Sequence, residues 1–132
     1  MKLITKHTDY AIKALCFMAR NKEQLFTTSA LAKKLKISQP FLRAILQILN
    51  KEHVVTSYKG KCGGFKLAIS PDRIFIVYLI KIFQGPIKFD HCFIKNNLCP
   101  DIRTCPMKKK LKEIGNYINR EFESLTIKEL LG

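Results

Sequence analysis

The sequence lacks the apolar segment that a membrane-spanning helix needs. Its longest apolar run, Ile74–Ile80, ends at Lys81, whereas a helix needs about 20 apolar residues to cross a bilayer. The N-terminal residues also lack the apolar block of a secretory signal peptide. We therefore expect a cytoplasmic protein that does not bind membranes. Thiols stay reduced in that compartment, so its cysteines are expected to bind metal or undergo redox chemistry rather than form structural disulfides.

Acidic residues are scarce. The chain has 10 Asp and Glu against 24 Lys and Arg, which gives a net charge of +14. Residues 1–70 carry 13 of the basic and 3 of the acidic residues, so +10 of this charge falls in the N-terminal half. The partner is expected to be a polyanion. Nucleic acid is favoured over a membrane surface, because the charge accompanies a sequence that is 47% hydrophobic and can form one compact domain.

Catalytic motifs are also missing. The three histidines are dispersed, no serine or cysteine stands in a nucleophile motif, and no pair of carboxylates falls on one face. The sequence therefore predicts a binding protein and not an enzyme.

The N-terminal half has the pattern of a helix-turn-helix. A first helix is expected over residues 5–20. A short helix follows with Thr28 as its N-cap, then a tight turn at Lys36-Ile37, then a second helix capped by Ser38. Apolar residues of this second helix are spaced to face inward; they are Leu42, Ile45, Leu46 and Leu49. The residues expected at the DNA are Thr28, Ser38, Gln39, Pro40, Phe41 and Arg43. Gln39, Phe41 and Arg43 are expected to face base edges, and the Arg43 guanidinium suits guanine.

A hairpin is expected next. Residues 53–58 and 65–69 have strand character, and the turn between them contains three glycines. A hairpin after a helix-turn-helix forms a winged helix. Lys59, Gly60 and Lys61 at the tip allow the backbone to approach phosphate and a lysine to enter a minor groove. Cys62, beside them, is interpreted as an incidental exposed thiol.

The C-terminal half predicts a helix from Pro71 to Phe83, a loop over 88–104, a long helix over 105–123 and a small final helix. The long helix carries an apolar stripe that includes Leu111, Ile114, Ile118 and Phe122. A stripe of this length favours pairing with a second copy, and a twofold DNA site suits a homodimer. The expected fold is mainly α with a small β-hairpin wing: a winged helix-turn-helix over 1–84, a cysteine loop over 85–104, and a dimerisation helix and C-terminal segment over 105–132.

Three cysteines, Cys92, Cys99 and Cys105, lie in or next to the expected loop with C-x6-C-x5-C spacing. A structural zinc site usually has a tight C-x2–4-C pair, and this loop has none. The wider spacing favours an iron–sulfur cluster. Zinc, disulfide-based sensing without a cluster, and a cluster carrier that does not bind DNA remain alternatives. Cys16 is interpreted as a core residue, so these residues alone identify no fourth ligand.

The order of these motifs resembles regulators of the IscR/NsrR type along nearly the whole chain. The matching segments are Thr8-Asp-Tyr-Ala-Ile-Lys-Ala-Leu, Ile37-Ser-Gln-Pro-Phe-Leu, Gly60-Lys-Cys-Gly-Gly-Phe-Lys-Leu-Ala and Gln84-Gly-Pro-Ile, followed by the three cysteines. The resemblance implies a homodimeric transcription factor, in our interpretation a repressor. Its DNA affinity would depend on a 2Fe–2S or 4Fe–4S cluster bound by Cys92, Cys99 and Cys105.

The resemblance also suggests the fourth ligand. The IscR branch has a histidine where this chain has Lys108, whereas the NsrR branch uses an aspartate of the other subunit, which matches Asp9. This pattern favours 4Fe–4S over 2Fe–2S. Two features depart from the family: the first cysteine gap has six residues where five is common, and Lys36 stands where glycine is frequent. Arg43 replaces an acidic residue of the IscR branch, so we expect a different operator.

Overall fold

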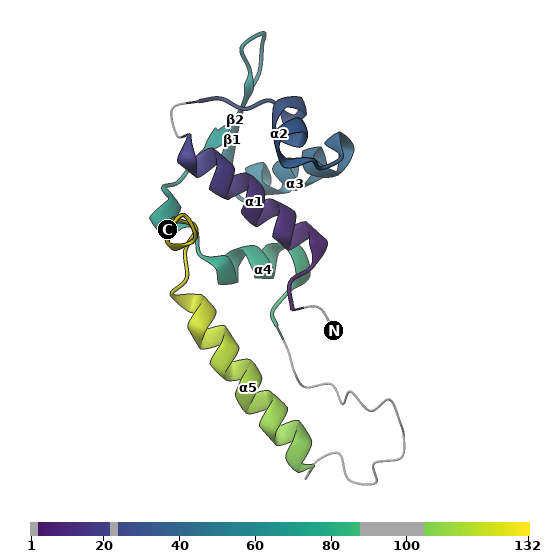
Figure 1. Ribbon diagram of the computed structural model, residues 1–132, viewed down its shortest axis with the longest axis vertical. Coiled ribbons are helices and arrows are strands. Elements are labelled where there is room, and N and C mark those ends of the chain that lie inside the picture. The colour runs from purple at the N-terminus through teal and green to yellow at the C-terminus, as the bar shows by residue number, and fades with distance from the viewer. Residues whose placement is uncertain (1–2, 22–23, 88–104) are drawn as a thin grey trace.

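The computed structural model describes residues 3–21, 24–87 and 105–132, which form a mainly helical unit with one hairpin (Figure 1). The elements are α1 (Lys6–Arg20), α2 (Thr28–Leu35), α3 (Gln39–Lys51), β1 (Val55–Tyr58), β2 (Gly64–Leu67), the 3-10 helix η1 (Pro71–Arg73), α4 (Ile76–Gln84), α5 (Pro106–Glu123) and α6 (Ile127–Leu130). This order confirms the predicted fold. Among these helices, none is both long and apolar enough to span a membrane.

The core lies between α1, α3 and α4. The four inward residues predicted for α3, from Leu42 to Leu49, are fully buried. The matching face of α1 includes Leu15 and Met18, which are also buried. Burial of each such side chain contributes about 1.5–3 kcal/mol to stability. These contacts fix α3, the second helix of the helix-turn-helix, against the rest of the domain.

Hydroxyl side chains cap the helices of the helix-turn-helix. Ser38 caps α3 as predicted, because its Oγ accepts a hydrogen bond from the Phe41 amide at 3.4 Å. The cap of α2 is Thr27, whose Oγ1 accepts from the Ala30 amide at 3.1 Å. The prediction that Thr28 is the cap was therefore wrong by one residue. Two adjacent threonines offer the same capping chemistry, and only the backbone distinguishes them.

Lys36 ends α2 in the left-handed conformation, with φ 56° and ψ 44°. An L-residue pays about 1–2 kcal/mol for this conformation, and glycine avoids that penalty but loses more entropy on folding. We expect Lys36→Gly to raise the free energy of unfolding by about 0.5–1 kcal/mol. The control Lys33→Gly, inside α2, should lower it by about 1 kcal/mol. Urea denaturation at one fixed protein concentration measures both; a loss of stability in Lys36→Gly would contradict the strain argument.

The wing is an antiparallel hairpin in which Val55 pairs with Leu67 and Tyr58 with Gly64. Phe26 adds a bridge to Phe65, with N–O distances of 2.9 and 2.7 Å between their main chains. This close approach needs a glycine at position 64, because an added Cβ would lie 2.7 Å from the carbonyl oxygen of Phe26. The bridge ties the base of the wing to the segment before α2.

The helix expected from Pro71 to Phe83 is divided. The chain makes a short 3-10 turn at Pro71–Arg73 and α4 begins only at Ile76. The residues between them pair with the C-terminal segment: the Ile76 amide donates to the Leu125 carbonyl, and the Ile127 amide to the Ile74 carbonyl, both at 2.9 Å. The predicted continuous helix was therefore wrong, because this backbone pairs with a distant segment.

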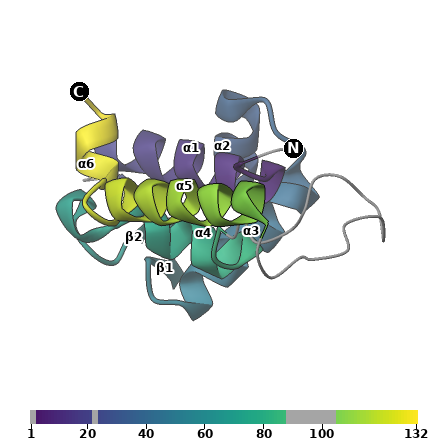
Figure 2. The ribbon, with the colours of Figure 1, turned by 90° about the horizontal axis from the view of Figure 1, so that it is seen from below.

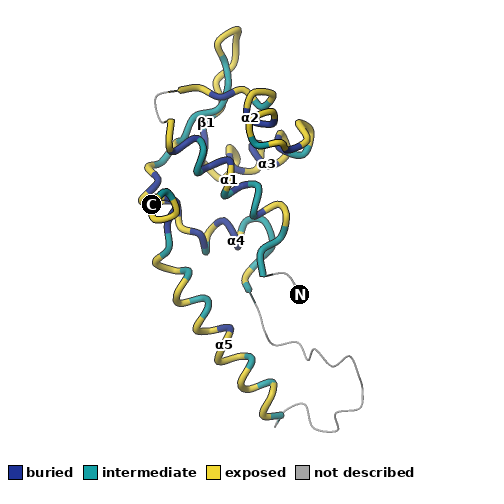
Figure 3. The backbone as a smooth tube through the Cα atoms, in the orientation of Figure 1, coloured by how far each residue is buried: buried dark blue, intermediate teal, exposed yellow. Residues whose placement is uncertain are grey.

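The final helix returns to the N-terminal unit. Ile127 of α6 is fully buried in the core. By contrast, α5 extends away from that core, and its N-terminal end lies farthest from the wing (Figure 1). Seen from below, α5 runs along the underside of the molecule (Figure 2). Gly115 is the buried residue of α5, and most of the others are exposed (Figure 3). The division of the chain into parts at residues 85 and 105 stays a prediction. In the structure, α6 of the third part packs with the winged helix of the first part.

Candidate DNA-binding surface and cysteine site

One face of α3 is free to meet a ligand. Ser38, Gln39, Pro40 and Arg43 are exposed, and Gln39 and Arg43 are one helical turn apart on the same face. Thr28, at the start of α2, is half-buried. The structure thus brings Gln39 and Arg43 together on the outer surface of the helix-turn-helix.

Phe41 lies on a different face of α3. Its ring centroid is 4.5 Å from that of His7 and 5.3 Å from that of Tyr10, both on α1. Phe41 does not share the outer face of Gln39 and Arg43, since residues two apart on a helix point in nearly opposite directions. Direct contact of Phe41 with DNA stays a prediction, while its observed contact is with the first helix.

The wing projects from the end of the molecule that carries α2 and α3 (Figure 1). Lys59, Gly60 and Lys61 are exposed at its tip, and Gly60 has φ 113°. Asn50 at the end of α3 accepts a hydrogen bond from the Ser57 amide at 3.2 Å. This contact links the recognition helix to the wing. It was not predicted, because the helical pattern of the sequence shows only that Asn50 faces outward.

The charge of this end is almost entirely positive. Residues 24–66 contain eight Lys and Arg and one acidic residue, Glu52. That carboxylate accepts a hydrogen bond from the Tyr78 hydroxyl at 3.1 Å. Burial and this hydrogen bond both raise the pKa of Tyr78.

The helix-turn-helix and the lysine-tipped wing both lie on this basic surface, which fits the phosphate backbone of a duplex.

The cysteine site is described only at Cys105. Cys92 and Cys99 lie outside the described residues, so the structure does not test whether the three thiols converge. Cys105 is half-buried at the N-cap of α5 and makes no side-chain capping hydrogen bond there. Within residues 3–21, 24–87 and 105–132, no three His, Cys, Asp or Glu side chains form a group that could hold a metal.

The surroundings of Cys105 suit an anionic sulfur ligand. The first amides of a helix have no partner inside the helix and favour negative charge at that end. Thiolates are the usual ligands of iron–sulfur clusters and accept hydrogen bonds from such amides. Cys105, the one proposed thiol ligand that the structure describes, therefore fits an iron–sulfur cluster.

Asp9 lies in the first turn of α1, and its carboxylate is 2.8 Å from the Lys13 ammonium. The hydrogen bond and charge of Asp9 raise the pKa of Lys13. Both side chains are about half exposed, so solvent screens this pair and the carboxylate remains available. Within one chain, the first turn of α1 and the Cys105 end of α5 lie well apart (Figure 1). That Asp9 of a second copy is the fourth ligand stays a prediction.

The two other thiols lie elsewhere. Cys16 is half-buried beside the core, where desolvation raises its pKa more than Arg20 lowers it. Cys62 is exposed on the wing. Figure 1 shows α1 and the wing, which carry these two thiols, away from the N-terminal end of α5.

The side chains of the apolar stripe on α5 differ in how far they are buried. Phe122 packs against the core, and Leu111 and Ile118 are half-buried. Ile114 is 44% exposed, and Met107 and Tyr117 are each 58% exposed. The protruding part of the helix thus presents apolar side chains that are exposed among the residues the structure describes.

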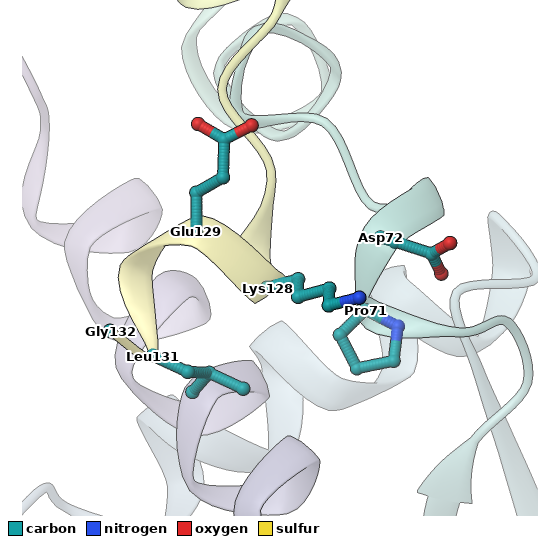
Figure 4. A pocket seen from close by; sticks show the side chains of 6 residues that line it. All are labelled: Pro71, Asp72, Lys128, Glu129, Leu131 and Gly132. Carbon is teal, nitrogen blue, oxygen red and sulfur yellow. The ribbon is translucent and has the colours of Figure 1, made fainter.

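A separate open hollow of about 570 Å³ lies between η1 and α6, lined by Pro71, Asp72, Lys128, Glu129, Leu131 and Gly132 (Figure 4). The Ser70 hydroxyl donates to Asp72 and lowers the pKa of that carboxyl. No residue of the predicted DNA or cysteine sites lines this hollow.

Comparison with known proteins agrees with this architecture. The family model of Rrf2, described as an iron-dependent transcriptional regulator, matches residues 4–132. A protein of Aquifex aeolicus described as an HTH-type transcriptional regulator is 36% identical over 124 residues, which cover 92% of this chain and 86% of that protein. The HTH-type transcriptional regulator NsrR of Bacillus subtilis is 30% identical over 133 residues, with 99% and 90% covered.

Solved structures share the fold. CymR, the global cysteine regulator of B. subtilis, has a TM-score of 0.81 at 22% identity, and the match covers 99% of this chain and 97% of CymR. IscR of T. potens has a TM-score of 0.76 at 23% identity, with 99% and 86% covered. The matched relatives are regulators, which agrees with the prediction that this chain is not an enzyme. The chain belongs to the Rrf2 family and is a DNA-binding transcriptional regulator.

Proposed function

We propose that this regulator binds its operator as a homodimer, most simply as a repressor, and that an iron–sulfur cluster controls the binding. The observation that carries the proposal is the position of Cys105. It lies at the protruding end of a helix whose apolar face is exposed in the described part of the chain, far from the proposed DNA-binding surface. A ligand site there can lie at a dimer interface. Binding at that site can then change the distance and orientation between the two DNA-binding units.

The DNA contacts follow from the basic end. Each α3 enters a major groove, where the Arg43 guanidinium donates two hydrogen bonds to a guanine and Gln39 contacts a neighbouring base. Lys59 and Lys61 contact phosphates or the adjacent minor groove. Ser38 and Thr28, at the starts of their helices, lie close to the backbone of the duplex.

The dimer forms through α5. Pairing of two α5 helices covers Ile114 with its neighbours Leu111 and Ile118, and places two α3 helices about a twofold axis. Phe122, which packs on its own core, would fix the base of this helix rather than contribute most of the interface.

The cluster would be held by Cys92, Cys99 and Cys105, with Asp9 of the partner subunit as the fourth ligand. When bound, the group supplies an oxygen-, nitric oxide- or iron-sensitive link between protomers, and the ligand set favours 4Fe–4S. A carboxylate is a hard donor and a more labile ligand than thiolate, so Asp9 would be the weakest of the four ligands. In the single chain, the same carboxylate pairs with Lys13.

A thiol-based sensor without a cluster is the second candidate. The same fold occurs in CymR, described as a global cysteine regulator, and in an oxidized form of Staphylococcus aureus CymR. Anaerobic purification separates the two candidates. Brown protein with iron and acid-labile sulfide in similar amounts supports the cluster, whereas colourless protein that forms a disulfide between these cysteines supports thiol sensing.

The DNA-binding surface is tested by the salt dependence of affinity. Replacing Lys59 and Lys61 with alanine should weaken binding of any duplex and reduce the slope of log K against log salt concentration by about 0.9 for each phosphate that is no longer neutralised. Fluorescence anisotropy with a random duplex measures this slope. As a matched control, Lys109→Ala with Lys112→Ala removes two exposed lysines of α5, at the opposite end of the molecule. An equal change of slope in both pairs would contradict the proposed surface.

A further inference from the structure

Gln84, the last residue of α4, joins two segments that are far apart in the sequence. Its Oε1 accepts hydrogen bonds from the Thr5 amide at 2.9 Å and from the Thr8 hydroxyl at 2.8 Å. Its Nε2 donates to the Leu3 carbonyl at 2.9 Å. Both acceptor positions and one donor of this amide are therefore used on the start of α1. Thr8 is fully buried, so removal of Gln84 Oε1 leaves its hydroxyl with only the Thr5 hydroxyl, 3.1 Å away, as a partner.

The first turns of α1 reach the recognition helix directly. His7 and Tyr10 flank the ring of Phe41 with centroid distances of 4.5 and 5.3 Å. Phe41 lies in the first turn of α3, on the face opposite Gln39 and Arg43. This end of α1 therefore packs directly against the end of α3 that carries Gln39 and Arg43, the residues proposed to contact bases.

The other side of Gln84 reaches α5. Gly85 follows it with φ 81°, a conformation that favours glycine. Two residues later, the Ile87 carbonyl accepts a hydrogen bond from the Asn119 side chain of α5 at 3.2 Å. Only Gly85 and Pro86 thus separate Gln84 from Ile87, which contacts the proposed dimer helix.

We propose that Gln84 is a positioning residue that transmits the placement of α5 to the recognition helix. The path runs from Asn119 through Ile87 to Gln84, then from Thr5 and Thr8 along the first turns of α1 to Phe41. The inference deepens the proposed function and rests on it for the origin of the signal. The mechanical link itself consists of residues 3–10, 41, 84–87 and 119 and can be measured without any bound metal.

The test compares variants of the cluster-free full chain on a duplex selected from a random library by the wild-type protein. Gln84→Met keeps the length of the side chain and removes all three hydrogen bonds. It should weaken binding of the selected duplex about 5-fold while changing binding of a random duplex less than about 2-fold, as expected for a coupling contact. Gln84→Glu keeps the two acceptor contacts but places a carboxylate oxygen against the Leu3 carbonyl, so it should restore only part of the affinity.

A double-mutant cycle separates coupling from general destabilisation. In a Phe41→Leu background, Gln84→Met should change the affinity less than about 2-fold, because the path is already interrupted. Asn21→Ala is the control, since it removes one side-chain bond to the Phe17 carbonyl at the other end of α1; it should leave the affinity unchanged. Equal effects of Gln84→Met in both backgrounds, or no effect in either, would overturn the inference. All affinities are measured well below the unfolding transition of each variant.

The role of the cluster is a separate readout in the same experiment. The affinity of the wild-type protein for the selected duplex is measured before and after loading of the cluster. If it changes, and Gln84→Met reduces that change about 5-fold, Gln84 also transmits the effect of the cluster to the DNA-binding surface. If loading changes neither protein, the proposed sensing fails while the cycle still decides the role of Gln84. If both respond equally to loading, signalling through Gln84 is excluded and the sensing proposal stands.

Discussion

Simultaneous replacement of Cys92, Cys99 and Cys105 with serine should reduce the iron and acid-labile sulfide of anaerobically purified protein from about four of each per protomer to background. A serine hydroxyl does not replace a thiolate as an iron–sulfur ligand at neutral pH. The visible absorption that gives the protein its colour should disappear with the iron. Elemental analysis and absorption spectra of the same preparation measure both quantities.

Two other thiols supply the control. Cys16→Ser with Cys62→Ser removes the half-buried thiol of α1 and the exposed thiol of the wing, neither of which we place at the cluster. This pair should keep its full iron and sulfide content. Loss of iron in the control alone would move the site to those residues. Stoichiometric zinc in colourless wild-type protein would replace the cluster with a zinc site.

Ile114→Lys should convert the dimer to a monomer at micromolar concentration. The side chain is 44% exposed in the single chain, so the substitution changes the monomer little. In the dimer, the ammonium would be buried without a partner, which costs several kcal/mol and raises the dissociation constant by at least about 100-fold. Sedimentation velocity measures the oligomeric state, and circular dichroism checks that the helices remain.

Lys112→Ala is the matched control on the opposite face of α5, and it should leave the dimer intact. If Ile114→Lys stays dimeric, the protomers pair through a different surface. Loss of the dimer should also weaken binding of a twofold operator far more than binding of a random duplex, because one α3 then reads only one half-site.

Local chemistry explains the features that the sequence predicted well. The inward face of α3, its Ser38 cap and the long helix that starts after Cys105 all follow from periodicity and capping within one element. The hairpin follows from its strand residues and glycines. These signals lie within about ten residues of the structure they specify, so they depend little on the rest of the chain.

The features that were missed depend on distant partners. The break before α4 exists because residues 74–76 pair with residues 125–127. The packing of Phe41 against His7 and Tyr10 was not predicted, because these aromatic residues lie on another helix. Gln84 carried no signal beyond its place in the Gln84-Gly-Pro-Ile segment, and only the fold brings it to Thr5 and Thr8. The positive φ of Lys36 likewise depends on the packing of α2 against α3, which requires a tight turn between them.

The most direct test of the account measures operator affinity in one preparation before and after anaerobic removal of the cluster. We predict a change of at least about 10-fold in the dissociation constant. The triple serine variant should stay at the cluster-free value whatever the treatment. Equal affinities of the loaded and stripped wild-type protein would contradict the claim that the cluster controls DNA binding.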